Sequence, residues 1–148
     1  MNHIQNEEGL AVSRYLEGFN CAQAVLSVFC SQLGLDRENA LRVAAAFGGG
    51  LNWTGETCGV VVGAFMVIGL KYGNITADDD RAEEFTNFYA GEFVENFTAR
   101  NGSIVCGKLL GCDVGTPEGR VTAIEKGLHE TLCTKYVRDA AEIIRELL

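Results

Sequence analysis

The chain has 148 residues, of which 47% are hydrophobic and 22% charged, so we expect a globular protein rather than a disordered one. That length suits a single domain over residues 1–148. The formal net charge of -8 argues against nucleic-acid binding through a basic face. The longest apolar run, Cys58–Leu70, is shorter than the roughly 20 residues that cross a bilayer. Since the N-terminal sequence also lacks the pattern of a secretory signal, we expect a cytoplasmic protein without a membrane segment.

Apolar residues recur with helical spacing along most of the chain, which predicts a compact all-α bundle of roughly six to eight helices. The first helix is expected over about residues 4–16, ending at Gly18. Asn20 is a typical N-cap for the second helix, CAQAVLSVFCSQLG. Asp36 is a typical N-cap for the third, RENALRVAAAF, which stops at the three glycines 48–50.

A glycine-rich loop precedes the longest apolar segment, for which we predict a buried central helix over about residues 57–72 with Thr57 as its cap. The spacing of Gly59 and Gly63 would let another helix approach closely. A long amphipathic helix is expected from Thr76. Its acidic first turn complements the helix dipole, which favours a solvated helix start over a metal site.

Three more helices are expected in the C-terminal part of the chain. Ser103 can cap a short helix, IVCGKLLG. Thr116–Pro117 places a proline at the first helical position, where helices favour it, and that helix is expected to run to about His129. The last helix is predicted from near Cys133 to Leu148.

The six cysteines carry the chemical information in this sequence. In a cytoplasmic protein they are expected to be catalytic, metal-binding or buried rather than structural disulfides. Four are predicted at or next to helix N-termini: Cys21, Cys58, Cys106 and Cys133. Unpaired N–H groups and the helix dipole stabilise an anion there, which can lower the pKa of a thiol and provide a thiolate nucleophile or metal ligand. Cys30, near a helix end, and Cys112, in a loop, lack this feature and are expected to pack, with Cys112 better placed to join the site.

Other motifs are weaker. The absence of C-x-x-C and C-x-x-C-H excludes a thioredoxin-like motif, a zinc ribbon and covalent haem attachment, so any shared site must be assembled by the fold. The segment FGGGLNWTGET lacks the ending of a phosphate-binding loop and is interpreted as a tight turn, with Trp53 as a lid beside Cys58. His129 could orient a thiolate at Cys133, although a surface or capping role is favoured. No signature of a substrate pocket is apparent.

The contexts of the four cysteines resemble the C_GCAxxG_C_C family of small redox-active proteins. The matching segments are NCAQAVL, GGGLNWTGETCGVVVGAFMVIGLKYG, CGKLLG and a cysteine ahead of VRDAAEII, from about Tyr15 to the C-terminus. Val60 stands where the family element has alanine, which adds bulk but removes no chemical group. The resemblance implies a thiol-redox or metal role, found in prokaryotes and often in anaerobes, at the same four cysteines.

The chemistry stays open between a dithiol redox protein and a metal-binding protein. In the first, two of Cys21, Cys58, Cys106 and Cys133 form a disulfide pair, as in a thiol oxidoreductase served by a partner protein or a small-molecule electron donor. In the second, all four hold an iron–sulfur cluster or Zn²⁺. A disulfide needs two Cα atoms within about 7 Å, whereas a metal needs all four thiols to converge. A purely structural bundle would leave them scattered. We favour the redox interpretation.

Overall fold

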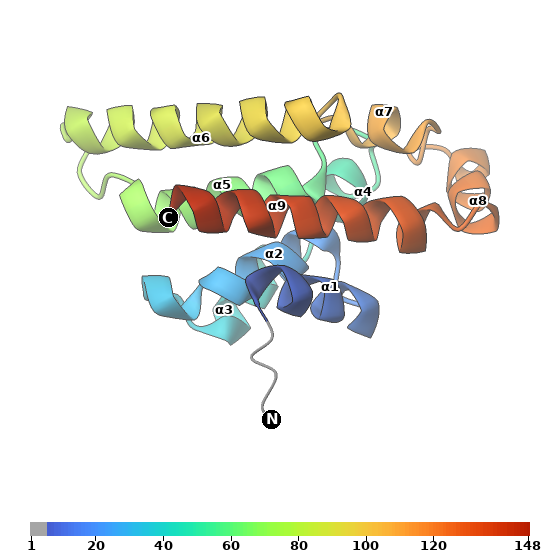
Figure 1. Ribbon diagram of the computed structural model, residues 1–148, viewed down its shortest axis with the longest axis horizontal. Helices are drawn as coiled ribbons and strands as arrows, with labels where there is room; N and C mark the ends of the chain where they lie inside the picture. The colour runs from blue at the N-terminus through green and yellow to red at the C-terminus, as the bar shows by residue number, and fades with distance from the viewer. Residues whose placement is uncertain (1–5) are drawn as a thin grey trace.

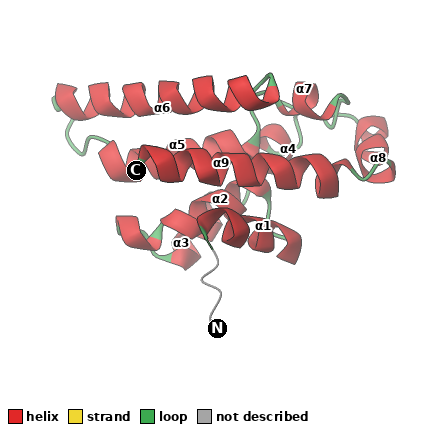
Figure 2. Ribbon diagram, viewed as in Figure 1, coloured by secondary structure: helices red, strands yellow, loops and turns green. Residues whose placement is uncertain are grey.

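The computed structural model describes residues 6–148, which form eight regular α-helices and no strand (Figures 1 and 2). The regular helices are α1 (Glu7–Glu17), α2 (Cys21–Phe29), α3 (Arg37–Val43), α5 (Gly59–Tyr72), α6 (Asp80–Asn101), α7 (Cys106–Leu110), α8 (Pro117–Glu125) and α9 (Thr134–Leu147). Three short turns join them: a 3₁₀ turn (Ser31–Leu33), α4 (Gly48–Leu51) and a π turn (His129–Cys133). The predicted all-α fold is confirmed.

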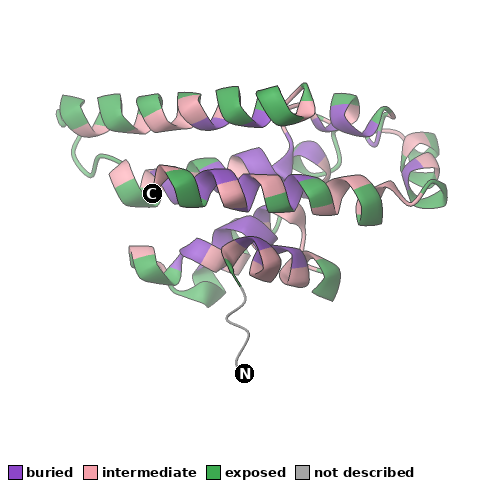
Figure 3. Cartoon of the chain, in the orientation of Figure 1, coloured by how far each residue is buried: buried purple, intermediate pink, exposed green. Residues whose placement is uncertain are grey.

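The helices lie in three layers. Helix α6 forms one outer layer, α5 and α9 lie in the middle, and α1, α2 and α3 form the other side (Figure 1). Helix α1 packs on α9 and α2, α2 packs on α5, and α6 contacts both middle helices. The buried residues concentrate where α5, α2 and the inner face of α9 meet (Figure 3). No helix in the described part of the chain has the length and apolarity that a membrane crossing requires.

Local sequence signals explain several helix boundaries. Asn20 and Gln23 form a reciprocal capping box at the start of α2, and the Asp36 carboxylate accepts a hydrogen bond from the Asn39 N–H at the start of α3. The Thr116 hydroxyl accepts from the Gly119 N–H at 3.0 Å, so the predicted cap of α8 is also confirmed. Gly18 ends α1 in the left-handed conformation, as predicted.

Three predicted caps are wrong. Thr57 pairs with Val105 in an isolated antiparallel bridge, so the chain stays extended through Thr57 and α5 begins at Gly59. Ser103 accepts a hydrogen bond from the Val105 N–H, which makes a turn rather than a helix start. Helix α6 begins after Asp79, whose carboxylate accepts from the Ala82 N–H, and not at Thr76. The acidic residues of this first turn are exposed, as expected for a solvated helix start.

Helices α2 and α5 approach closely through two glycines. A Cβ atom at Gly63 would lie 3.0 Å from the Ala22 carbonyl oxygen, and one at Gly59 would lie 2.8 Å from the Phe47 oxygen and against the Cys21 sulfur. The predicted close approach along this pair is therefore confirmed. It places the first residue of α2 directly over the first turn of α5.

Candidate functional site

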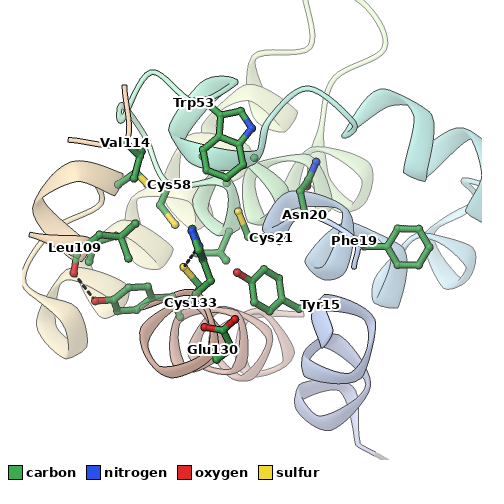
Figure 4. Close-up of a pocket in the computed structure, with 18 of the residues that line it drawn as sticks. Tyr15, Phe19, Asn20, Cys21, Trp53, Cys58, Leu109, Val114, Glu130 and Cys133 are labelled. Atoms are coloured by element: carbon green, nitrogen blue, oxygen red, sulfur yellow. Dashed lines mark hydrogen bonds between the residues drawn. The ribbon is translucent and has the colours of Figure 1, made fainter. Parts of the chain in front are cut away.

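The structure brings the four predicted cysteines to one cavity of about 420 Å³. Cys21 reaches it from α2, Cys58 from the start of α5, Cys106 from α7 and Cys133 from the π turn before α9. Figure 4 shows the Cys21, Cys58 and Cys133 sulfur atoms directed toward the same space, with Trp53 and Tyr15 at its edges. All six cysteines are free thiols. Sequence reasoning did not foresee this cavity.

The two remaining cysteines lie apart from the cavity lining. Cys30 is fully buried in the core, and its thiol donates to the Ser27 carbonyl oxygen at 3.5 Å. Cys112 is half-buried in the loop after α7 and does not line the cavity. The structure therefore separates these two from the other four by position.

Cys21 has the environment expected for a thiolate. It is the first residue of α2, directly after the Asn20 cap. A hydrogen bond from the Cys58 thiol, together with the backbone N–H groups of Ala22, Gly49 and Cys21 itself, lowers the pKa of Cys21 even though burial opposes this. Helix-end N–H groups and a donor thiol thus favour the anion at this residue.

Cys58 has the opposite environment. We expected it at the first helical position, but it is the N-cap residue of α5, and its own backbone N–H is bonded to the Ile104 oxygen at 2.8 Å. Its hydrogen bond to Cys21, burial and the adjacent negative charge raise the pKa of Cys58 well above the ordinary value. Of the two neighbours, Cys21 is therefore the one that ionises more easily and Cys58 the one that keeps its proton.

A short pairing of two loops positions Cys58 beside Cys106. The Cys106 N–H donates to the Glu56 oxygen at 2.7 Å, and the Gly107 N–H donates to the Gly55 oxygen at 3.0 Å. These bonds flank the Thr57–Val105 bridge. Cys106 is the first residue of α7, as predicted. Burial nevertheless raises the pKa of Cys106 to about 12, so the helix start does not lower the pKa of this thiol.

Cys133 lies directly before α9, next to the start of the last helix as predicted, but no side-chain cap forms there. It ends a π turn that continues into α9 without a break, so its neighbouring N–H groups are used within the helix. Burial raises the pKa of Cys133 to about 11, and a hydrogen bond from the Tyr15 hydroxyl opposes that change. Nδ1 of His129 lies 3.7 Å from the Cys133 sulfur, so the imidazole is beside the thiol. Single π turns are frequent at functional sites.

The glycine-rich segment forms a left-handed turn over residues 49–53. All five residues have φ between 58° and 70°, including Leu51 and Trp53, for which this region costs roughly 1–2 kcal/mol each. The turn directs the Gly49 N–H to Cys21 and brings the Trp53 ring to 6.0 Å from His129, edge to face. The expected tight packing is confirmed, since a Cβ atom at Gly50 would lie 2.6 Å from that of Cys106.

The lowered pKa that helix ends predict is therefore found at Cys21 and not at the other three cysteines. Among residues 6–148, no three His, Cys, Asp or Glu side chains are grouped closely enough to hold one metal ion. The donor set does not fit a single Zn²⁺, which needs four ligands at about 2.0–2.3 Å. Four cysteine thiols around one cavity are still the ligand type that an iron–sulfur cluster, which is larger than a single ion, requires. Tyr15 and Tyr136 complete the walls of the cavity, and no sequence motif marks either of them as a site residue. The Tyr136 hydroxyl donates to the Leu109 oxygen at 2.8 Å.

Comparison with known sequences agrees with this site. The family described as "Putative redox-active protein (C_GCAxxG_C_C)" matches residues 19–147, a span that contains all four cavity cysteines. Curated proteins and solved structures gave no significant match. Because the family match covers most of the sequence, the chain belongs to the C_GCAxxG_C_C family.

Proposed function

We propose that this protein is a dithiol–disulfide redox protein whose active pair is Cys21 and Cys58. The observation that carries the proposal is the position of the Cys21 sulfur against Gly59, the residue after Cys58, on the wall of a cavity that both cysteines line. The pKa is lowered at Cys21 and raised at Cys58. Thiol–disulfide exchange needs a thiolate that attacks and a neighbouring thiol that resolves, and these two residues supply one of each. Both lie on a cavity, so a substrate can reach them.

The exchange proceeds in two displacements. The Cys21 thiolate attacks one sulfur of a substrate disulfide, which forms a mixed disulfide and releases the other substrate sulfur as a thiolate. Cys58 gives its proton to that thiolate, and its sulfur then attacks the Cys21 sulfur. The second substrate sulfur leaves as a thiolate. The substrate has gained two electrons, the protein holds a Cys21–Cys58 disulfide, and the reverse sequence oxidises a dithiol.

The environment of Cys58 suits a resolving residue. While Cys21 is an anion, its charge is one of the causes that keep the Cys58 proton in place. Once Cys21 enters a mixed disulfide, that charge disappears and Cys58 becomes easier to ionise. The second displacement is therefore enabled by the first, and a free Cys58 thiolate does not form beside an unreacted Cys21.

A redox titration tests the proposal. The protein is equilibrated in dithiothreitol and glutathione buffers of graded ratio, free thiols are blocked with a maleimide, and peptides are assigned by mass spectrometry. We expect one reversible Cys21–Cys58 disulfide that disappears in Cys21→Ser and Cys58→Ser. Cys30→Ser is the matched control, because Cys30 lies outside the cavity. A folded protein that forms no such disulfide in any buffer refutes the proposal.

A second candidate is electron transfer through an iron–sulfur cluster. It is favoured by one observation, that all four thiols line the same cavity. Cys21, Cys58, Cys106 and Cys133 would hold the cluster, which would supply one-electron chemistry when bound. Anaerobic reconstitution with iron and sulfide tests this. Stoichiometric iron that falls in each of the four Cys→Ser variants, but not in Cys30→Ser, would favour it over the dithiol pair.

A further inference from the structure

We infer that the dithiol or disulfide exchanging with this pair is a small uncharged molecule that enters the cavity, and not an anionic thiol or a protein. This inference rests on the proposed dithiol function and adds the class of substrate. Three properties of the cavity support it: the depth of the resolving thiol, the charge at the rim and the nature of the walls.

The resolving thiol is reached only from inside the cavity. Cys58 is 6% exposed, whereas Cys21 is half-buried. A cavity of about 420 Å³ lies within the range of small-molecule sites. In the proposed exchange the substrate sulfur released first takes the Cys58 proton, so both substrate sulfurs enter this space. A disulfide on the surface of a folded protein would have to insert a loop to do so. A small dithiol can enter it whole.

The charge at the cavity rim disfavours anions. Among the described residues that line the cavity, Glu130 is the only one with a permanent charge, and it is exposed. Its carboxylate is close enough to act electrostatically on both Tyr15 and Cys133. Arg120 contacts the outer part of the site, with its guanidinium 6.0 Å from the Trp53 ring centroid and its Nε donating to the Val114 oxygen, but it is not part of the lining. An anionic substrate would therefore meet a carboxylate, and the chain as a whole carries a charge of -8.

The walls are apolar and offer few polar partners. They include Val60, Leu109, Leu110 and Val114, with the rings of Trp53 and Tyr136. The Tyr136 hydroxyl already donates to the Leu109 oxygen, and the Tyr15 hydroxyl is near enough to Cys133 to affect its pKa. A charged group brought into such walls would lose its hydration without a replacement, whereas an alkyl chain would be stabilised there.

Two dithiols that differ only in charge provide the test. Dihydrolipoamide is neutral and dihydrolipoate carries a carboxylate, while their reacting sulfurs are identical. The protein is first oxidised with diamide, and its reduction by each dithiol is followed by stopped-flow Trp53 fluorescence and acid-quenched thiol labelling. We expect dihydrolipoamide to react about tenfold faster than dihydrolipoate at low salt, because repulsion between like charges slows association by about this factor.

Variants assign the preference to the rim. In Glu130→Gln the ratio of the two rates should fall toward one, whereas Glu125→Gln, an exposed carboxylate on α8 outside the lining, should leave the ratio unchanged. Equal rates in the wild-type protein, or faster reduction by a reduced thioredoxin than by dihydrolipoamide, would overturn the inference while leaving the dithiol function intact. If diamide produces no Cys21–Cys58 disulfide, the proposed function fails first and this inference fails with it.

Discussion

Replacing Gly59 by alanine should disrupt the contact on which the thiol pair depends. Gly59 is the first residue of α5, and the structure leaves no room for a side chain there. An added Cβ would meet the Cys21 sulfur, the Phe47 carbonyl oxygen at 2.8 Å and the Ala22 nitrogen at 3.2 Å. Two of these three atoms belong to the backbone, so a rotamer change cannot relieve the overlap. Helix α2 must move away from α5.

The magnitude follows from two opposing effects. Alanine gains at most about 1 kcal/mol over glycine in helix propensity, and less at a first helical position. Forcing one extra carbon into a packed interface costs about 1–3 kcal/mol. We therefore expect Gly59→Ala to lower the free energy of unfolding by about 1–2 kcal/mol. The shift of α2 should also move Cys21 away from Cys58 and slow alkylation of Cys21 at neutral pH.

The matched control is Gly69→Ala in the same helix. A Cβ atom at Gly69 would meet nothing within 4 Å, and neither Gly59 nor Gly69 has a positive φ. Gly69→Ala should therefore raise the free energy of unfolding by up to about 1 kcal/mol. Urea unfolding monitored by circular dichroism measures both variants, and a shifted midpoint with an unchanged m-value reports stability alone. If Gly59→Ala proves as stable as Gly69→Ala, with Cys21 as reactive as in the wild type, the close approach of α2 and α5 is not what holds the site.

Three further outcomes are expected. Because the pKa of Cys21 is lowered, the rate of its alkylation by iodoacetamide should reach a plateau at a lower pH than the rate for an ordinary thiol. Cys106, with a pKa of about 12, should stay unlabelled at pH 8. Peptide mapping measures both. Arg145→Ala leaves the buried Glu8 carboxylate without its partner 2.8 Å away, so it should lower the free energy of unfolding in urea by about 1–3 kcal/mol. Adding Glu8→Gln to the same chain should restore most of that loss. Oxidation of the active pair should change Trp53 emission, and an unchanged spectrum would show that the left-handed turn does not respond to the thiolate.

Local signals made much of the fold predictable. The caps at Asn20, Asp36 and Thr116 act within three residues of the chain, so the sequence alone indicates them. The spacing of Gly59 and Gly63 was also sufficient to predict that another helix lies against α5. These features explain why an all-α bundle could be expected without any structural information.

The details of the site depend on contacts that sequence periodicity does not report. The pairing of residues 55–58 with 104–107 is too short to show an alternating pattern, yet it moves Cys58 out of the first helical position. The π turn at Cys133 continues a regular helix, so nothing local marks it. Leu51 and Trp53 are residue types that avoid positive φ, so their identity gives no sign of the left-handed turn. Burial, which raises the pKa of Cys106, is likewise a property of the assembled fold.

The left-handed turn has a consequence for the energy of the proposed couple. The Gly49 and Ala22 N–H groups favour a negative charge on the Cys21 sulfur, and that charge exists only when the pair is reduced. A reduced form stabilised in this way raises the reduction potential, because the disulfide gains nothing from the same donors. Compared with the same pair lacking these donors, the proposed couple would take up electrons more readily. Evolution could adjust this redox poise through the backbone of the turn without replacing either cysteine.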